Sequence, residues 1–112
     1  MASGGNKKMW GGFVDVFGNT PRNRILEFLL EMKDLDFTIG DISREIELNR
    51  ATTYNVMEDL INEHIVRPTR KISGTQVYKL NTDKKEIKVL LITFNHILEM
   101  ISKKRELSKM VV

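Results

Sequence analysis

The chain has 112 residues, 41% of them hydrophobic and 29% charged, as expected for one modest globular domain. It contains no cysteine, which excludes disulfides, thiolate metal sites and cysteine nucleophiles. No run of about 18 apolar residues occurs and the first residues lack the apolar core of a signal peptide, so we expect a cytoplasmic protein without a membrane segment.

The charge is distributed more informatively than its formal net value of +3 suggests. Between Glu63 and Asp83 no acidic residue occurs, and the basic residues there are Arg67, Arg70, Lys71 and Lys79. A basic stripe of this kind favours a polyanionic partner.

The N-terminal third predicts an arm followed by a helix. Residues 1–12, MASGGNKKMWGG, are rich in glycine and small residues, which indicates a flexible arm that includes Met9 and Trp10. One apolar turn at residues 13–17 follows. Thr20 is a good N-cap and Pro21 suits the first helical position, and apolar residues at helical spacing then predict a helix over 21–33.

The next two helices are predicted from their capping residues. Thr38 and Asp41 have the spacing of a capping box, which predicts a short helix over 39–46 after a very short strand at 37–38. Asn49 is the N-cap candidate for a helix that extends to residue 63. Its core-facing edge is predicted at Thr53, Met57 and Leu60, which leaves the polar residues near its start on the outward face.

The pattern then changes to that of a β-hairpin. Residues 65–71 and 75–80 are rich in strand-forming residues, and the glycine turn ISGT separates them. Pro68 within the first strand predicts an edge position or a bulge, because proline cannot donate to a central strand.

A long terminal helix is predicted over 83–109, with Asn81 and Thr82 as candidate caps. Its apolar residues repeat at steps of three and four, as in helix-on-helix packing. Such a seam either folds back on its own domain or pairs with a second copy. The seam consists of Ile87, Leu90, Leu91, Phe94, Ile97, Leu98 and Ile101.

The stretch LNRATTYNVMEDLINEHIV, residues 48–66, resembles the winged helix-turn-helix domain of prokaryotic and archaeal transcriptional regulators. The segment GNTPRNRILEFLLE, residues 18–31, is similar to the first helix of that group, and the resemblance covers residues 13–80. Two positions depart from the common pattern: His64 replaces a glycine, and Thr53 replaces an aliphatic core residue. The matching residues are Leu48, Asn49, Arg50, Ala51, Thr52, Thr53, Met57, Leu60 and Ile65.

The resemblance implies a mainly α fold with a small β-hairpin (α+β), a winged helix-turn-helix with a long C-terminal helix. It divides the chain into an arm (1–12), a DNA-binding domain (13–81) and a dimerisation helix (82–112). Many such regulators dimerise through terminal helices, so it also implies a homodimer whose interface is the seam given above. A two-fold dimer predicts a palindromic site in double-stranded DNA.

The helix over 49–63 is the predicted reader of the major groove, and the wing over 70–76 the predicted contact to the backbone or minor groove. Arg50 can pair with a guanine, and Asn49 or Asn55 with an adenine. The acidic residues Glu58, Asp59 and Glu63 occur in the rear half of the helix, which we expect to lie away from DNA. The predicted DNA-binding residues are Asn49, Arg50, Thr52, Tyr54, Asn55, Arg70, Lys71, Thr75 and Gln76.

No pattern indicates an enzyme, a metal site or a cofactor. His64 and His96 are far apart and lack carboxylates at ligand spacing, and no phosphate loop or nucleophile set occurs. The sequence leaves two alternatives open. A winged helix used for protein–protein assembly predicts a recognition face that tolerates mutation. An architectural or plasmid-partition DNA binder predicts little sequence preference and a steep salt dependence.

Overall fold

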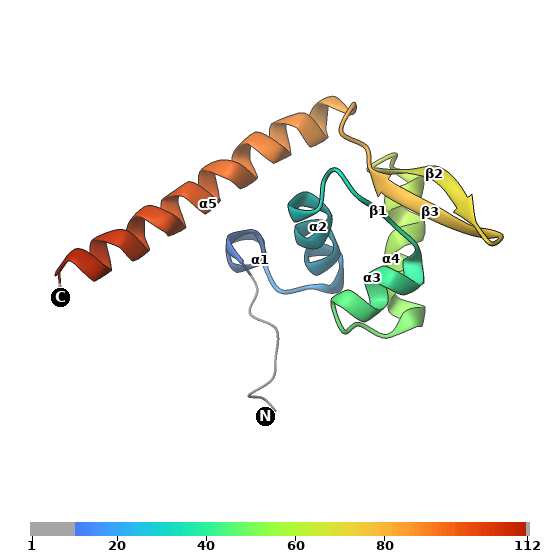
Figure 1. Cartoon of the computed structure of the whole chain (residues 1–112), viewed down its shortest axis with the longest axis horizontal. Helices are drawn as coiled ribbons and strands as arrows, with labels where there is room; N and C mark the ends of the chain where they lie inside the picture. Colours follow the sequence, from blue (N-terminus) through green and yellow to red (C-terminus); the bar gives the residue numbers. More distant parts are fainter. Residues whose placement is uncertain (1–10, 112) are drawn as a thin grey trace.

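The computed structural model describes the backbone of residues 11–111 and the side chains as far as residue 104. The predicted arm, with Met9 and Trp10, lies almost wholly outside this part. No helix in the described part is both long enough and apolar enough to span a bilayer. The elements, in chain order, are α1 (Gly12–Phe17), α2 (Pro21–Glu31), β1 (Asp36–Phe37), α3 (Ile39–Glu45), α4 (Arg50–Asn62), β2 (Val66–Ile72), β3 (Thr75–Leu80) and α5 (Lys85–Val111) (Figure 1).

The first two helices pack together beneath α5 (Figure 1). Helix α2 begins as predicted, since Thr20 accepts a hydrogen bond from the Asn23 amide and Pro21 occupies the first turn. It ends two residues earlier than predicted, at Glu31. The second half of α2 is buried on every side, from Ile25 to Leu30, and lies at the centre of the core.

Helix α3 confirms the predicted capping box. The Thr38 hydroxyl accepts from the Asp41 amide at 3.0 Å, and the Asp41 carboxylate accepts from the Thr38 amide at 3.1 Å. Because Thr38 is the cap, strand β1 lies one residue earlier than predicted. After α3, Glu47 adopts a left-handed conformation with φ 53° and turns the chain sharply toward α4.

Helix α4 has a capping motif at each end. Asn49 Oδ1 accepts from the Thr52 amide at 2.8 Å, which confirms the predicted N-cap. At the other end His64 has φ 60°, with hydrogen bonds from the His64 amide to the Ile61 carbonyl and from the Ile65 amide to the Leu60 carbonyl. This is a Schellman motif, in which glycine usually occupies the position of His64. The unusual histidine therefore sits where the chain needs a left-handed residue.

The sheet has the order β1-β3-β2, all antiparallel. Strand β2 is an edge strand, and its register shifts between Pro68 and Arg70, so both features predicted from Pro68 are present. The hairpin turns at Ser73 and Gly74, which have φ 50° and 82°. A type I′ turn requires positive φ at both positions.

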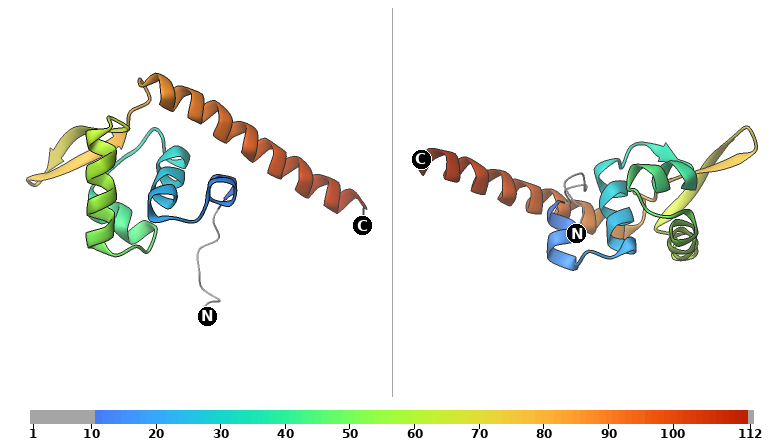
Figure 2. Two further views of the ribbon diagram at one scale, coloured as in Figure 1. Left: turned by 180° about the vertical axis from the view of Figure 1, so that it is seen from behind. Right: turned by 90° about the horizontal axis from the view of Figure 1, so that it is seen from below.

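Helix α5 begins at Lys85 rather than Asp83, so the predicted capping role of Asn81 and Thr82 is wrong. The Asn81 amide nitrogen instead donates to the His64 carbonyl at 2.9 Å and ties the end of β3 to the turn after α4. From there α5 passes over α2 and α1 and extends well beyond them (Figures 1 and 2).

The first half of α5 folds back on its own chain. Ile87 and Phe94 are 2% and 3% exposed and belong to the central core, so these two seam residues are not available to a second chain. Further along, α1 packs against α5 so closely that a Cβ on Gly12 would lie 2.3 Å from Ile97 and 2.6 Å from Ile101. Leu98 remains exposed. Part of the predicted dimer seam is therefore intramolecular.

Candidate nucleic-acid interface

The predicted division of α4 into a buried and an exposed side is present. Thr53, Met57 and Leu60 are fully buried, and Thr53 also donates its hydroxyl proton to the Asn49 carbonyl at 2.8 Å. This bond explains how a threonine fits where the resemblance expected an aliphatic residue. Arg50, Ala51, Tyr54 and Asn55 are exposed, and Thr52 is half-buried. The N-terminal half of α4 is thus held by the core and presents polar side chains to solvent.

Asn49 has a structural function in addition to its predicted one. Its amide oxygen is the N-cap acceptor of α4. Pairing with adenine needs both the oxygen and the nitrogen of the amide, so Asn55, which caps nothing, is the better placed of the two asparagines.

Arg50 lies across α3. Its Nη2 is 3.1 Å from the position that a Cβ on Gly40 would occupy, and Arg44 Nη1 is 3.6 Å from that same point. Arg44 pairs with Asp41, whereas no hydrogen bond or ion pair of Arg50 occurs among the described residues. The absence of a side chain at Gly40 lets two guanidinium groups converge at the junction of α3 and α4, and such a cluster attracts anions.

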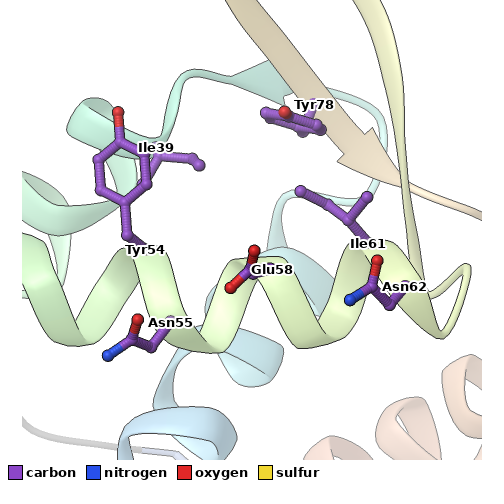
Figure 3. A pocket seen from close by; sticks show the side chains of 7 residues that line it. All are labelled: Ile39, Tyr54, Asn55, Glu58, Ile61, Asn62 and Tyr78. Carbon is purple, nitrogen blue, oxygen red and sulfur yellow. The ribbon is translucent and has the colours of Figure 1, made fainter.

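A groove of about 490 Å³ runs beside α4, between this helix, the start of α3 and the central strand β3 (Figure 3). Tyr54, Asn55 and Glu58 line it from α4, and Tyr78 lines it from β3. Glu58 therefore lies on the same side of α4 as two predicted DNA contacts. Its position in the rear half of the helix had indicated the opposite.

Glu63, by contrast, is tied back to the body of the protein. It forms a two-pronged ion pair with Arg22 of α2, with distances of 2.7 and 3.2 Å. The hydrogen bonds from Arg22 hold the pKa of Glu63 below its usual value. This pair fixes the C-terminal end of α4 against α2.

The wing is braced by an ion pair that crosses β3. Arg70 Nε and Nη2 donate to the two carboxylate oxygens of Asp36 in β1 at 3.0 and 3.1 Å, and the Thr69 hydroxyl donates to the same carboxylate at 2.8 Å. The hydrogen bonds from Arg70 and then from Thr69 hold the pKa of Asp36 below its usual value. Asp36 in turn raises the pKa of Arg70.

These contacts separate the predicted wing residues into two groups. Arg70 is engaged by Asp36, and the Gln76 amide nitrogen donates to the carbonyls of Arg70 and Val77 at 2.9 and 3.1 Å. Lys71 and Thr75 are exposed, and their side chains form no hydrogen bond within the described part of the chain. Lys71 and Thr75 are therefore the wing side chains most available to a phosphate.

The sequence did not single out Glu58 or Tyr78 as parts of this surface. It also did not reveal that the guanidinium groups of Arg44 and Arg50 converge there. Their positions depend on how α3, α4 and β3 meet, which no local motif encodes. Among the described residues no group of three or more His, Asp or Glu side chains could hold a metal ion.

Comparison with known proteins places this arrangement among winged helices. No protein-family model and no curated protein matches the chain. Among solved structures, it is similar to HlyU from Vibrio cholerae (22% identity, 69% of this chain and 78% of that one, TM-score 0.55). It is also similar to the adhesin competence repressor AdcR from Streptococcus pyogenes (17%, 78% and 66%, 0.57) and to a possible transcriptional regulator from Methanosarcina mazei (15%, 81% and 78%, 0.54).

The chain therefore has the winged helix-turn-helix fold. Helices α3 and α4 form the helix-turn-helix, and β2 and β3 form the wing. Helix α4 and the β2–β3 hairpin lie next to each other on this fold (Figure 2).

Proposed function

We propose that the protein is a sequence-specific regulator of transcription that binds double-stranded DNA, acts in the cytoplasm and has no enzymatic activity. One observation carries the proposal: the N-terminal half of α4 is exposed and polar while its buried side is anchored in the core. The basic wing beside it adds charge for the DNA backbone. The similar structures named as a repressor and as a possible transcriptional regulator support the same reading.

In the proposed complex α4 enters the major groove, which admits one helix. Arg50 pairs with a guanine and Asn55 with an adenine, and Thr52 contacts a phosphate or a thymine methyl group. The Tyr54 hydroxyl, Lys71 and Thr75 contact phosphates and position the helix without reading sequence. Asn49 contributes mainly by capping α4, and Arg70 and Gln76 by shaping the wing.

The active form in this proposal is a homodimer. The outer face of α5 exposes Val89, Ile92 and Met100, which are 63%, 58% and 69% accessible, and α1 exposes Val16 and Phe17. Exposed apolar side chains grouped along one face of α5 support an association surface there. Two-fold pairing there would set two α4 helices about 34 Å apart, one turn of DNA, on a palindromic site.

The proposal is tested by measuring duplex affinity by fluorescence anisotropy over a range of salt concentrations. Arg50→Ala should weaken binding to the preferred site by about 1–3 kcal/mol and relax the choice at one base pair. Lys71→Ala should weaken all sequences similarly and reduce the salt slope by about one. Lys88→Ala, which removes an exposed charge from α5, is the matched control and should change neither.

The outcomes separate the alternatives. If the wild-type protein binds no duplex, the fold serves protein–protein assembly and the proposal is wrong. If it binds every duplex equally, it is an architectural binder. If Arg50→Ala weakens all sequences equally, Arg50 contacts a phosphate and the base-reading role of Arg50 is wrong.

A further inference from the structure

The groove-lining side of α4 continues past the residues predicted to touch DNA. Tyr54, Glu58 and Ile61 are spaced by four and three residues, which places them one above the other on a helix. Asn55 lies beside this row, and all four line the groove that β3 closes with Tyr78 (Figure 3). The carboxylate of Glu58 is therefore about one helical turn behind Asn55 on the surface proposed to enter DNA.

Three acidic residues around this surface are held in ion pairs, and Glu58 is not. Asp36 is paired with Arg70, Asp41 with Arg44, and Glu63 with Arg22. Glu58 forms no ion pair or hydrogen bond through its side chain within the described part of the chain. Its carboxylate oxygens therefore remain able to accept hydrogen bonds from a ligand, on a surface otherwise suited to a polyanion.

The chemistry of an uncommitted carboxylate in the major groove is restrictive. An ionised carboxylate only accepts hydrogen bonds, so phosphates and the acceptor atoms of guanine and thymine repel it. The N4 amino group of cytosine is the donor that Glu and Asp side chains take in the major groove. Adenine also presents an amino group, at N6, but the N7 acceptor lies beside it, whereas the major-groove edge of cytosine carries no acceptor. A carboxylate on this face therefore favours cytosine.

We propose that Glu58 is a specificity-determining residue that accepts a hydrogen bond from cytosine N4 at a base pair next to the one contacted by Asn55. This inference rests on the proposed function. In this role Glu58 weakens binding to sequences that present a hydrogen-bond acceptor or a phosphate at this point. The positive charges of the helix-turn-helix and wing supply the general affinity.

The test compares Glu58→Gln with Asp59→Asn by selecting bound sequences from a random duplex pool. Both variants remove one exposed negative charge from α4, so both should bind DNA more tightly in general. Asp59 does not line the groove, and it lies about 100° from Glu58 round the helix. Only Glu58→Gln should change the preferred base at one position, from cytosine toward adenine, since glutamine pairs with adenine N6 and N7.

The size of the effect is measured with four duplexes that differ only at that base pair. The wild-type protein and Asp59→Asn should prefer cytosine by about tenfold, and Glu58→Gln should lose that preference. If Glu58→Gln keeps the cytosine preference, or if Asp59→Asn loses it equally, the inference is overturned while sequence-specific binding stands. If the wild-type pool shows no enriched sequence, the proposed function fails together with it.

Discussion

Glu27 gives the sharpest test of how the fold holds its N-terminal helix. Its side chain is 2% exposed, and its carboxylate accepts from the Gly11 amide at 2.9 Å and from the Val14 amide at 3.0 Å. Both donors belong to the first turn of α1, which lacks a side-chain cap of its own. A residue of α2 thus caps α1 from a distance, and α1 in turn packs on α5. Glu27→Ala removes this cap.

The expected loss follows from the two bonds. A hydrogen bond to a charged group contributes about 1.5–3 kcal/mol, and a buried donor left without a partner adds a cost. Because α1 has only six residues and can shift to expose its amides to water, the lower value for each bond applies. We therefore expect Glu27→Ala to lower the free energy of unfolding by about 3 kcal/mol. Glu27→Gln keeps one strong acceptor and should lose about half of that.

Urea unfolding followed by circular dichroism measures both variants. Asp59→Ala, an exposed acidic residue of α4, is the control and should stay within about 0.5 kcal/mol of the wild type. Hydrogen exchange at the Gly11 and Val14 amides should rise in Glu27→Ala. A free energy of unfolding unchanged by Glu27→Ala, with these amides still protected, would refute the capping role.

The turn after α4, the wing and the outer face of α5 can each be tested by substitution. His64→Gly should raise the free energy of unfolding by about 1 kcal/mol, because glycine adopts positive φ without a steric cost; a lower urea midpoint would contradict the strain assigned to His64. Since the pKa of Asp36 is lowered by Arg70 and Thr69, its stabilisation of the wing should be present above the ordinary value of 3.8 and be lost as pH falls through the lowered value. Hydrogen exchange in β2 should show this acid loss in the wild type, while Asp36→Asn should already lack the protection at neutral pH; equal protection in both proteins would contradict the brace. Ile92→Glu combined with Met100→Glu should give folded monomers by light scattering. Phe94→Glu should instead unfold the chain, because it puts a charge into the core. A persistent dimer in the double variant would exclude the α5 face as the interface.

Much of the local structure was predictable because its causes are local. The Thr38–Asp41 capping box and the Asn49 cap each depend on residues three apart, and the bulge at Pro68 depends on one missing amide donor. The buried edge of α4 follows from helical spacing alone. His64 also stood out in the sequence, and its left-handed conformation supplies the physical reason.

The features that the sequence did not reveal join residues far apart in the chain. Asp36 and Arg70 are 34 residues apart, and Glu27 bonds to amides 13 and 16 residues before it. The sequence places Glu58 and Glu63 on the same rear half of α4, yet one lines the groove and the other is held by α2. Likewise, the apolar seam of α5 was compatible with either an internal or an external partner, and only the packing of α1 and α2 shows which residues are internal.

We propose that the exposed side of α4 reads base sequence as part of a two-fold dimer. Selection of bound sequences by the full chain from a random pool of DNA duplexes, at a stated salt concentration, tests this directly. The selection should yield an enriched palindrome with half-sites about one helical turn apart, and Arg50→Ala should lose one preferred base. A pool without enrichment, or a motif that Arg50→Ala, Asn55→Ala and Glu58→Gln all leave unchanged, would contradict it.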